Sequence, residues 1–424
     1  MTMTLAEIDP SALAFWQRPL QERADAFALL RAEDGPLFYA EPPVPFMRRG
    51  KGYWALVKHS DVCEASRNQE IFSSEPSATS ISDLPRYMSQ YFGSLINMDD
   101  PRHAKIRRVV SRAFTPRMLA KTEDDIARRA TRIVDELIAG GPGDFVERVA
   151  VRLPVEVICD LLGIPDRLYP TVIARTNVIL GNTDPEFTSI GPGLGLLSTA
   201  KGLGQVIRAA RDLHRLAAGL ARERVKDPTG DLTSALVSAN VDGERLTARE
   251  LGSFFLLLVV AGNETTRTAI AHGLKLLTDN PGQRDRLLAD LDGGIGGAVE
   301  EIVRYSTPVI FMRRNLTRDH EMNGHTYRAG DKVLLFYNSA NRDEAVFKDP
   351  DVFDITRHPN PHVAFGGPGS HFCLGANLAR REIAVMLREV FTRLPDIRSD
   401  GDPDRLLSAF INGYKRLPCT FTRP

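Results

Sequence analysis

One cysteine, Cys373, stands in a glycine-rich loop just before a segment with helical periodicity. The loop, residues 365–375, reads Phe-Gly-Gly-Pro-Gly-Ser-His-Phe-Cys-Leu-Gly, and the segment after it is apolar at helical spacing. A thiol at a helix N-terminus faces unpaired N–H groups and the positive end of the helix dipole, which both favour the thiolate. Glycines also let the backbone approach a large flat group, because no Cβ atom stands in the way.

Three interpretations of Cys373 are open from this loop alone. The cysteine could be a buried structural residue, or a catalytic nucleophile paired with His371, or a thiolate ligand of haem iron. His371 is two residues away, a spacing that does not by itself bring the ring to the sulfur. A haem thiolate pushes electron density onto the iron and favours cleavage of an O–O bond.

A second chemical signal lies in the longest predicted helix, residues 246–280. Thr247 and Glu250 form a capping box at its start, and Pro281 ends it, so the helix is roughly 48 Å long. Residues 254–262 are apolar on every face, which predicts a buried helix. Glu264 and Thr265 follow directly, and a buried carboxylate is costly unless it is paired or used. Gly262 lets a ligand lie against the backbone, and the Thr265 hydroxyl can take over a backbone hydrogen bond. The pair predicts a site of proton delivery.

Two weaker signals involve charged pairs on shorter helices. A helix opening at Pro101, with Asp99 or Asp100 as its cap, carries His103 and Arg107 at a spacing of four. This pair suits two anionic groups held side by side, although a solvated basic face has the same pattern. Glu301 and Arg304, three residues apart on a helix over 297–306, say little alone, because such pairs are common on surfaces.

Helices must position most of these residues. The pattern predicts strands or strand-like pieces over 36–39, 52–58 and within 308–336, an ordered meander over 341–361, and a last hairpin within 406–422. Segment 73–94 is a long loop of polar and apolar residues, which could be a lid or disordered. We interpret it as a lid, because Ile81, Leu84, Tyr87, Met88 and Tyr91 supply apolar contacts that a disordered segment would lack. Segment 181–204 is rich in Gly, Pro, Ser and Thr, and we interpret it as a second mobile segment. Helices are predicted over 12–32, 61–67, 121–139, 152–162, 169–180, 204–226, 231–239, 246–280 and 297–306.

Composition excludes several classes of protein. The 424 residues hold 54 Lys and Arg and 54 Asp and Glu, so the net charge is zero and nucleic acid is not an expected partner. The N-terminus lacks the pattern of a signal peptide, and no apolar run is long enough to span a membrane. The four cysteines form no disulfide framework. We therefore expect a cytoplasmic protein.

Three motifs in order resemble the cytochrome P-450 superfamily: Ala261-Gly-Asn-Glu-Thr265, Glu301-x-x-Arg304 and the Cys373 loop. The resemblance covers essentially the whole chain. It implies a single domain over 1–424, mainly α with small β-sheets, with haem b between the long helix and the helix after the Cys373 loop. It also implies an enzyme, a haem-thiolate monooxygenase that inserts one oxygen of O2 into an unactivated C–H bond.

The resemblance assigns roles residue by residue. Cys373 is expected to ligate the iron, and Glu264 and Thr265 to relay protons. Glu301 and Arg304 are expected to fix the meander. Further cofactor-binding residues are expected at His103, Arg107, Arg314 and His371, which match positions that bind the haem propionates, and at Ala261, Gly262, Phe365 and Gly375.

Two departures from the family pattern stand out. Phe365 precedes Cys373 by eight residues, one more than the commonest spacing, which affects its packing against the sulfur. Many relatives carry an arginine in the meander where this chain has Val352, and we expect Arg357 to complete the Glu301–Arg304 network instead.

Segments 255–267, 339–344, 360–367 and 371–381 resemble one actinobacterial branch, which hydroxylates terminal methyl groups of methyl-branched lipids and sterol side chains. That likeness implies ω-hydroxylation, with electrons from a ferredoxin and its reductase, in a monomer. The basic residues Arg108, Arg112, Lys121 and Arg381 could receive an acidic ferredoxin, or could be ordinary solvated charges. A narrow channel would present the chain end to iron, with walls expected at Phe254, Phe255, Leu258, Val309, Ile310 and Phe311.

Other functions remain as alternatives. The substrate could be another hydrophobic small molecule, such as a terpenoid or secondary metabolite. A peroxygenase driven by hydrogen peroxide, or a module that binds haem without turnover, would have no use for the Glu264–Thr265 pair.

Overall fold

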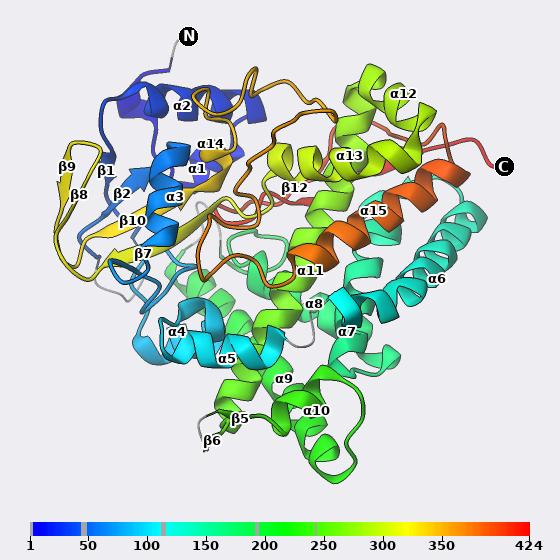
Figure 1. The fold of residues 1–424 in the computed structure, drawn as a ribbon, viewed down its shortest axis with the longest axis horizontal. Helices are drawn as coiled ribbons and strands as arrows, with labels where there is room; N and C mark the ends of the chain where they lie inside the picture. Colours follow the sequence, from blue (N-terminus) through cyan, green and yellow to red (C-terminus); the bar gives the residue numbers. More distant parts are fainter. Residues whose placement is uncertain (1–2, 44–48, 112–115, 191–194, 242–243) are drawn as a thin grey trace.

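Helix α11 (Ala248–Asp279) runs through the middle of the molecule, and other long helices pack around it (Figure 1). The computed structural model describes residues 3–43, 49–111, 116–190, 195–241 and 244–424. The predicted capping box starts α11: Thr247 Oγ1 accepts from the Glu250 N–H, and the Glu250 carboxylate accepts from the Thr247 N–H. The neighbours of α11 include α4 (Arg86–Gly93), α7 (Arg152–Leu162), α9 (Leu196–Lys226) and α15 (Ala376–Arg393).

The other helical elements are mostly shorter. They are η1 (Leu5–Glu7), α1 (Leu13–Gln17), α2 (Leu20–Ala32), α3 (His59–Arg67), η2 (Ser94–Asn97), α5 (Arg102–Ser111), α6 (Pro116–Gly140), the π-helical turn η4 (Val146–Ala150), η5 (Asp166–Leu168), α8 (Tyr169–Leu180), α10 (Leu232–Val237), α12 (Pro281–Ala289), α13 (Leu291–Ser306) and α14 (Tyr337–Ala340).

Strands form one larger sheet and several small ones beside the helices (Figure 1). In the five-stranded sheet the order is β1-β2-β10-β7-β3; β10 pairs with β2 in parallel, and the other pairs are antiparallel. The remaining sheets are β11-β14-β4, β12-β13, β5-β6 and β8-β9. The strands are β1 (Leu37–Tyr39), β2 (Tyr53–Leu56), β3 (Phe72–Ser73), β4 (Gly143–Asp144), β5 (Asn240–Val241), β6 (Glu244–Arg245), β7 (Phe311–Leu316), β8 (His320–Met322), β9 (His325–Tyr327), β10 (Lys332–Phe336), β11 (Arg398–Ser399), β12 (Asp404–Arg405), β13 (Tyr414–Arg416) and β14 (Pro418–Thr420).

The mainly α fold with small sheets confirms the predicted class, but some elements differ. The predicted helix over 12–32 is two helices, α1 and α2, because Pro19 interrupts it. Helix α4 lies inside the predicted lid 73–94, and α9 begins inside the predicted mobile segment 181–204, of which residues 191–194 lie outside the described part. The predicted last hairpin is wrong: β13 pairs with β12, whereas β14 pairs with β11 and β4.

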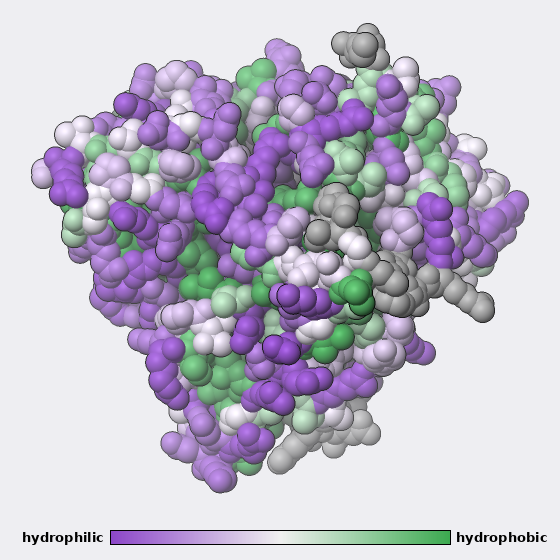
Figure 2. Space-filling model, turned by 180° about the vertical axis from the view of Figure 1, so that it is seen from behind, coloured by the Kyte–Doolittle hydropathy of each residue, from purple (hydrophilic) through white to green (hydrophobic). Residues whose placement is uncertain are grey.

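The face opposite to that of Figure 1 is mainly hydrophilic, with apolar residues in smaller patches (Figure 2). Within the described residues, no helix is both long enough and apolar enough to cross a membrane.

Candidate active site

A cavity lies between α11 and α15, closed on one side by the 365–375 loop. Its volume is about 250 Å³, and its walls are mostly apolar. Ten of the eleven predicted site residues line it: Ala261, Gly262, Thr265, His103, Arg107, Arg314, Phe365, His371, Cys373 and Gly375. The eleventh, Glu264, does not.

Cys373 lies at the start of α15 with its side chain exposed to this cavity. The Cys373 N–H donates to the Phe365 carbonyl over 2.8 Å, and Gly366 at φ +90° makes the turn between them possible. Burial raises the pKa of the Cys373 thiol, while the Gly375 N–H, Arg107 and Arg380 act in the opposite direction. The groups at the helix start therefore favour the thiolate, as expected, but their effect on the pKa is smaller than that of burial. A metal cation bound to the sulfur would supply the further stabilisation that the thiolate needs.

The Phe365 ring contacts a cation rather than only apolar groups. The Arg380 guanidinium lies 4.3 Å from its ring centroid, and the His362 ring is 5.9 Å away. Glu300 in turn binds Arg380 over 2.6 Å and lies 3.0 Å from His362. Despite the extra residue in the loop, Phe365 still lines the cavity beside Cys373.

Nitrogen donors of His103, Arg107 and Arg314 lie on one side of the cavity, and Arg314 has no carboxylate partner among the described residues. Arg314 is 4% exposed, and within the described residues its side chain donates only to the Arg313 carbonyl and forms no ion pair. His103 is 1% exposed; its Nδ1 lies 3.2 Å from Asp100 Oδ1, and its Nε2 has no partner. Asp100 also accepts from the Ala104 N–H, so it caps α5 as predicted.

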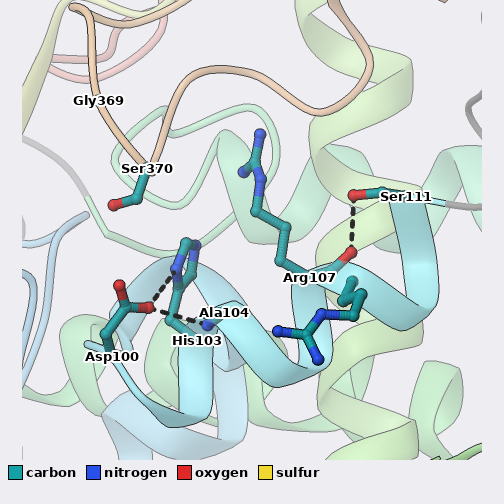
Figure 3. A pocket seen from close by; sticks show the side chains of 8 residues that line it. Asp100, His103, Ala104, Arg107, Ser111, Gly369 and Ser370 are labelled. Carbon is teal, nitrogen blue, oxygen red and sulfur yellow. Dashed lines mark hydrogen bonds and ion pairs between the residues drawn. The ribbon is translucent and has the colours of Figure 1, made fainter.

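Figure 3 shows His103 and Arg107 pointing from α5 toward the segment that holds Gly369 and Ser370. Arg107 donates to the Phe372 carbonyl, next to Cys373. His371 packs against His103 with ring centroids 4.2 Å apart, and its Nε2 lies 3.1 Å from the Ser74 hydroxyl. Burial and the charge of Arg314 lower the pKa of His371 to about 2, so this ring is neutral.

Glu264 and Thr265 face different surroundings. The Thr265 hydroxyl donates to the Ala261 carbonyl over 2.8 Å, the diversion of a backbone acceptor expected from the sequence. Glu264 is 1% exposed and forms a buried ion pair with Arg267, which also donates to Asn177 on α8. Burial raises the pKa of Glu264 while Arg267 opposes this, and Oε2 has no partner. Only the alcohol of the predicted pair therefore opens into the cavity.

The predicted channel walls divide into two groups. Phe254, Leu258 and Val309 line the cavity, together with Leu257 and Met312. Phe255, Ile310 and Phe311 do not line it and are 1–2% exposed in the hydrophobic core, so their prediction as walls is wrong. Met312 lines the cavity and Phe311 does not, because neighbouring side chains on β7 point to opposite faces of the sheet.

Sequence reasoning missed Glu382, which lines the cavity from α15. It is 3% exposed, Oε2 has no partner, and burial alone raises its pKa to about 8. Its signal in the sequence was a single acid at a position where the helical period of α15 requires an apolar residue.

The meander is fixed by a buried network. Glu301 and Arg304, both 0% exposed, form two hydrogen bonds of 2.7 and 2.8 Å. Arg357 Nε donates to Glu301 over 3.3 Å and its Nη2 donates to the Val352 carbonyl, which confirms Arg357 as the third member. Arg304 also donates to the Asn341 and Pro350 carbonyls, so one guanidinium holds the start and the middle of the meander.

These residues fit a haem. A thiol open to an apolar cavity fits a residue that would ligate haem iron. The Arg314 guanidinium without an ion pair and the unpartnered His103 Nε2, both buried, fit two carboxylates held side by side.

Comparisons with known proteins agree with this fit. A model of the family described as cytochrome P450 matches residues 41–395. A methyl-branched lipid omega-hydroxylase of Mycobacterium tuberculosis is 48% identical over 99% of this chain and 95% of its own. A steroid C26-monooxygenase of Mycolicibacterium smegmatis is 38% identical over 88% of this chain and 84% of its own. A solved Mycobacterium marinum cytochrome P450 in complex with pseudoionone has a TM-score of 0.91 and 42% identity, with 98% of each chain covered.

Proposed function

The chain belongs to the cytochrome P450 family of haem monooxygenases, and we propose that it hydroxylates the terminal methyl group of a methyl-branched lipid or of a sterol side chain. The observation that carries the proposal is the cavity on the Cys373 side of α11, whose apolar walls include Phe254, Leu258 and Val309. Relatives named for ω-hydroxylation and for C26 oxidation, at 48% and 38% identity, support the same class of substrate.

The haem is proposed to be haem b, and Cys373 would hold its iron. When bound there, it supplies activation of O2 and insertion of one oxygen into a C–H bond. His103, Arg107, Arg314 and His371 would surround its two propionates, and Ala261, Gly262, Phe365 and Gly375 would lie against its faces. Conversion of Cys373 to Ala should abolish the red-shifted Soret band of the ferrous–CO form. A variant that kept the band would refute this ligand.

Thr265 is proposed to hold a proton at Oγ1 for the reaction. In the resting arrangement this proton is donated to the Ala261 carbonyl. To pass it into the cavity, the hydroxyl would turn away from Ala261, give up its proton and accept a replacement from the Glu264 side of α11. Glu264 would deliver that proton from behind the helix, where Arg267 holds it in place.

Terminal oxidation depends on orientation more than on reactivity, because a terminal methyl is the least reactive C–H of a branched chain. The apolar walls would admit the chain end and exclude water. The bound orientation of the substrate would then decide which carbon is hydroxylated. Electrons would come from a ferredoxin and its reductase, and the protein would act as a cytoplasmic monomer.

Product analysis tests the substrate class. The reconstituted enzyme would receive a methyl-branched fatty acid, a straight-chain acid of equal length and cholest-4-enone. Mostly ω-alcohol from the branched acid or the sterol supports the proposal. Mostly in-chain alcohols from all three would overturn it and leave the monooxygenase intact.

A second candidate is a smaller branched ketone, favoured by the 42% identical relative that was solved with pseudoionone. Loss of the axial water on titration, read from the Soret band, would rank pseudoionone against the branched acid. Tighter binding and faster turnover of pseudoionone would favour the second candidate.

A further inference from the structure

A second cavity, of about 580 Å³, lies on the other side of the wall that closes the active-site cavity. It is formed by α2, the C-terminal half of α11, the end of α13 and the segments around β12 and β13. The two cavities share their wall: Pro308, Val309 and Tyr337 face the first, whereas Ser306, Ile310 and Asn338 face the second. None of the second cavity's residues takes part in the site described above.

Cationic side chains gather in this second cavity. Arg23 is 8% exposed and lies 5.5 Å from the Trp16 ring centroid, and its Nε has no hydrogen-bond partner. Arg405 donates only to the Arg18 carbonyl, over 3.3 Å. Within the described residues, neither guanidinium forms an ion pair. By contrast, Arg342 binds Asp351 over 3.1 Å and Lys275 binds Asp279 over 2.6 Å.

The buried His272 also lines this cavity. Its Nε2 lies 2.8 Å from the Asn412 carbonyl, and its ring stacks on Tyr414 with centroids 4.0 Å apart. Burial lowers the pKa of His272 to about 3, and the charges of Arg405, Arg23 and Arg342 add to this. Burial and the nearby Arg405 likewise lower the pKa of Arg23 to about 10. All three guanidinium groups line this cavity, and among the described residues only Arg342 of the three has an ion-pair partner, Asp351.

A buried charge such as that of Arg23 is costly without a counter-charge, and an anion between Arg23 and the half-buried Arg405 would supply one. The Ser306 hydroxyl, buried and without a partner, adds a neutral donor. The apolar part of the wall includes Trp16, Leu20, Phe27 and Ile310. Its acidic residues are Asp402 and two that are already paired, Asp279 with Lys275 and Asp351 with Arg342. An inorganic ion would use only the cationic part of this surface.

We propose that the second cavity binds an amphipathic carboxylate, with its carboxylate between Arg23 and Arg405 and its apolar body against Trp16 and Phe27. Such a ligand satisfies both parts of the wall, because charge-assisted hydrogen bonds hold one end and hydrophobic burial the other. The inference does not depend on which substrate the haem site takes.

The test uses tryptophan emission, because the chain has two tryptophans and Trp16 lines the cavity. In the Trp54→Phe holoenzyme Trp16 is the remaining one. Saturation with phenylimidazole, which ligates the iron, keeps the probe out of the haem site. Titration with octanoate should change Trp16 emission saturably while the Soret band stays constant. Octanol should bind at least about tenfold more weakly, the loss expected for a charged hydrogen bond, and octylammonium should not bind.

Variants then test the two arginines. Arg405→Gln should weaken octanoate binding by about tenfold or more, and Arg405→Lys should restore part of it. Arg23→Gln, read by calorimetry because Arg23 touches Trp16, should do the same. Arg328→Gln, an exposed arginine paired with Asp319, is the matched control and should change nothing.

Three results would overturn the proposal: octanol that binds as tightly as octanoate, octanoate binding that Arg405→Gln leaves unchanged, or inorganic phosphate that binds as tightly as octanoate. The last would show a site for simple anions in place of an amphipathic one. If Arg23→Gln fails to fold, Arg405→Gln with its lysine counterpart decides the matter.

Discussion

Thr265 carries the hydroxyl of the Glu264–Thr265 pair that opens into the haem-side cavity. Conversion to Ala should leave haem content and substrate binding near normal, because Ala fits the same space. O2 consumption should continue, but more of it should appear as hydrogen peroxide than as alcohol, since the proton held at Oγ1 is lost. The ratio of peroxide to product measures this, and Thr265→Ser is the control that should restore coupling. A Thr265→Ala enzyme that stayed fully coupled would remove Thr265 from the mechanism.

Glu382 gives the protein a residue-level pH dependence. Its ordinary pKa of 4.5 rises to about 8 in the fold, so between these values the folded state keeps a proton that the unfolded state loses. Stability should therefore fall as the pH rises from about 4.5 to about 8, and change no further from this group above that.

Glu382→Gln should abolish this slope and leave the variant more stable than the unmodified protein at pH 8 by a few kcal/mol. Denaturant midpoints of the holoenzyme at pH 5 and pH 8 provide the measurement. Glu389→Gln, on the same helix but paired with Arg393, is the control. Equal slopes in Glu382→Gln and the unmodified protein would contradict the assignment.

At the scale of single elements, the segment before β7 separates cavity from core. Val309→Ala should widen the cavity beside the substrate and move part of the hydroxylation from the chain end to inner carbons. Phe311→Leu is the matched control: Phe311 packs on Phe336 and Phe410 in the core, so the change should lower stability without altering the product pattern. Unchanged regioselectivity in Val309→Ala would show that Val309 does not form the channel.

Elements with a full helical period could be predicted closely. The bounds of α7 and α8 agree with the ranges predicted from apolar spacing, and α11 agrees within two residues at its start. Helix α4 could not, because it is short and lies among Ser and Pro residues; its Tyr91 gains order from stacking on His214 of α9, a tertiary contact.

The residues of the site could be predicted from the sequence, but the directions in which their side chains point could not. Spacing placed Glu264 and Thr265 together, yet the helix turns one into the cavity and the other toward Arg267. Val309 lines the cavity and Phe311 does not, a difference that the sequence could not show because the register of the sheet decides which face of a strand meets the cavity. Glu382 was missed because its one signal, an acid at an apolar position of the helical period, has no partner elsewhere in the sequence that would mark the residue as functional.

For the whole molecule, the proposed electron donor requires a cationic surface near Cys373. Arg108 is exposed and lines the same pocket as Arg107, while Arg381 pairs with Glu123. Arg112 lies outside the described residues, as does the Lys121 side chain. Arg108→Glu should slow reduction by an acidic ferredoxin by about tenfold at low salt, with a smaller effect at high salt.

Stopped-flow reduction followed at the CO band measures this rate, and reduction by dithionite should be unaffected. Arg328→Glu serves as the control for charge alone. If Arg108→Glu and Arg328→Glu slow the ferredoxin equally, Arg108 does not lie at the docking surface.

The pairing of β14 with β4 joins segments roughly 275 residues apart, and the pairing of β10 with β2 joins segments at a similar separation. At a synthesis rate of about 5–20 residues per second, β4 leaves the ribosome tens of seconds before its partner exists. The haem-side cavity has the same history, since Ile158 and Cys373 both line it. Early helices must therefore persist with open apolar faces through much of translation. Haem can therefore bind only after most of the chain has been synthesised. We expect the yield of holoenzyme in cells to depend on chaperones and on the haem supply at that stage.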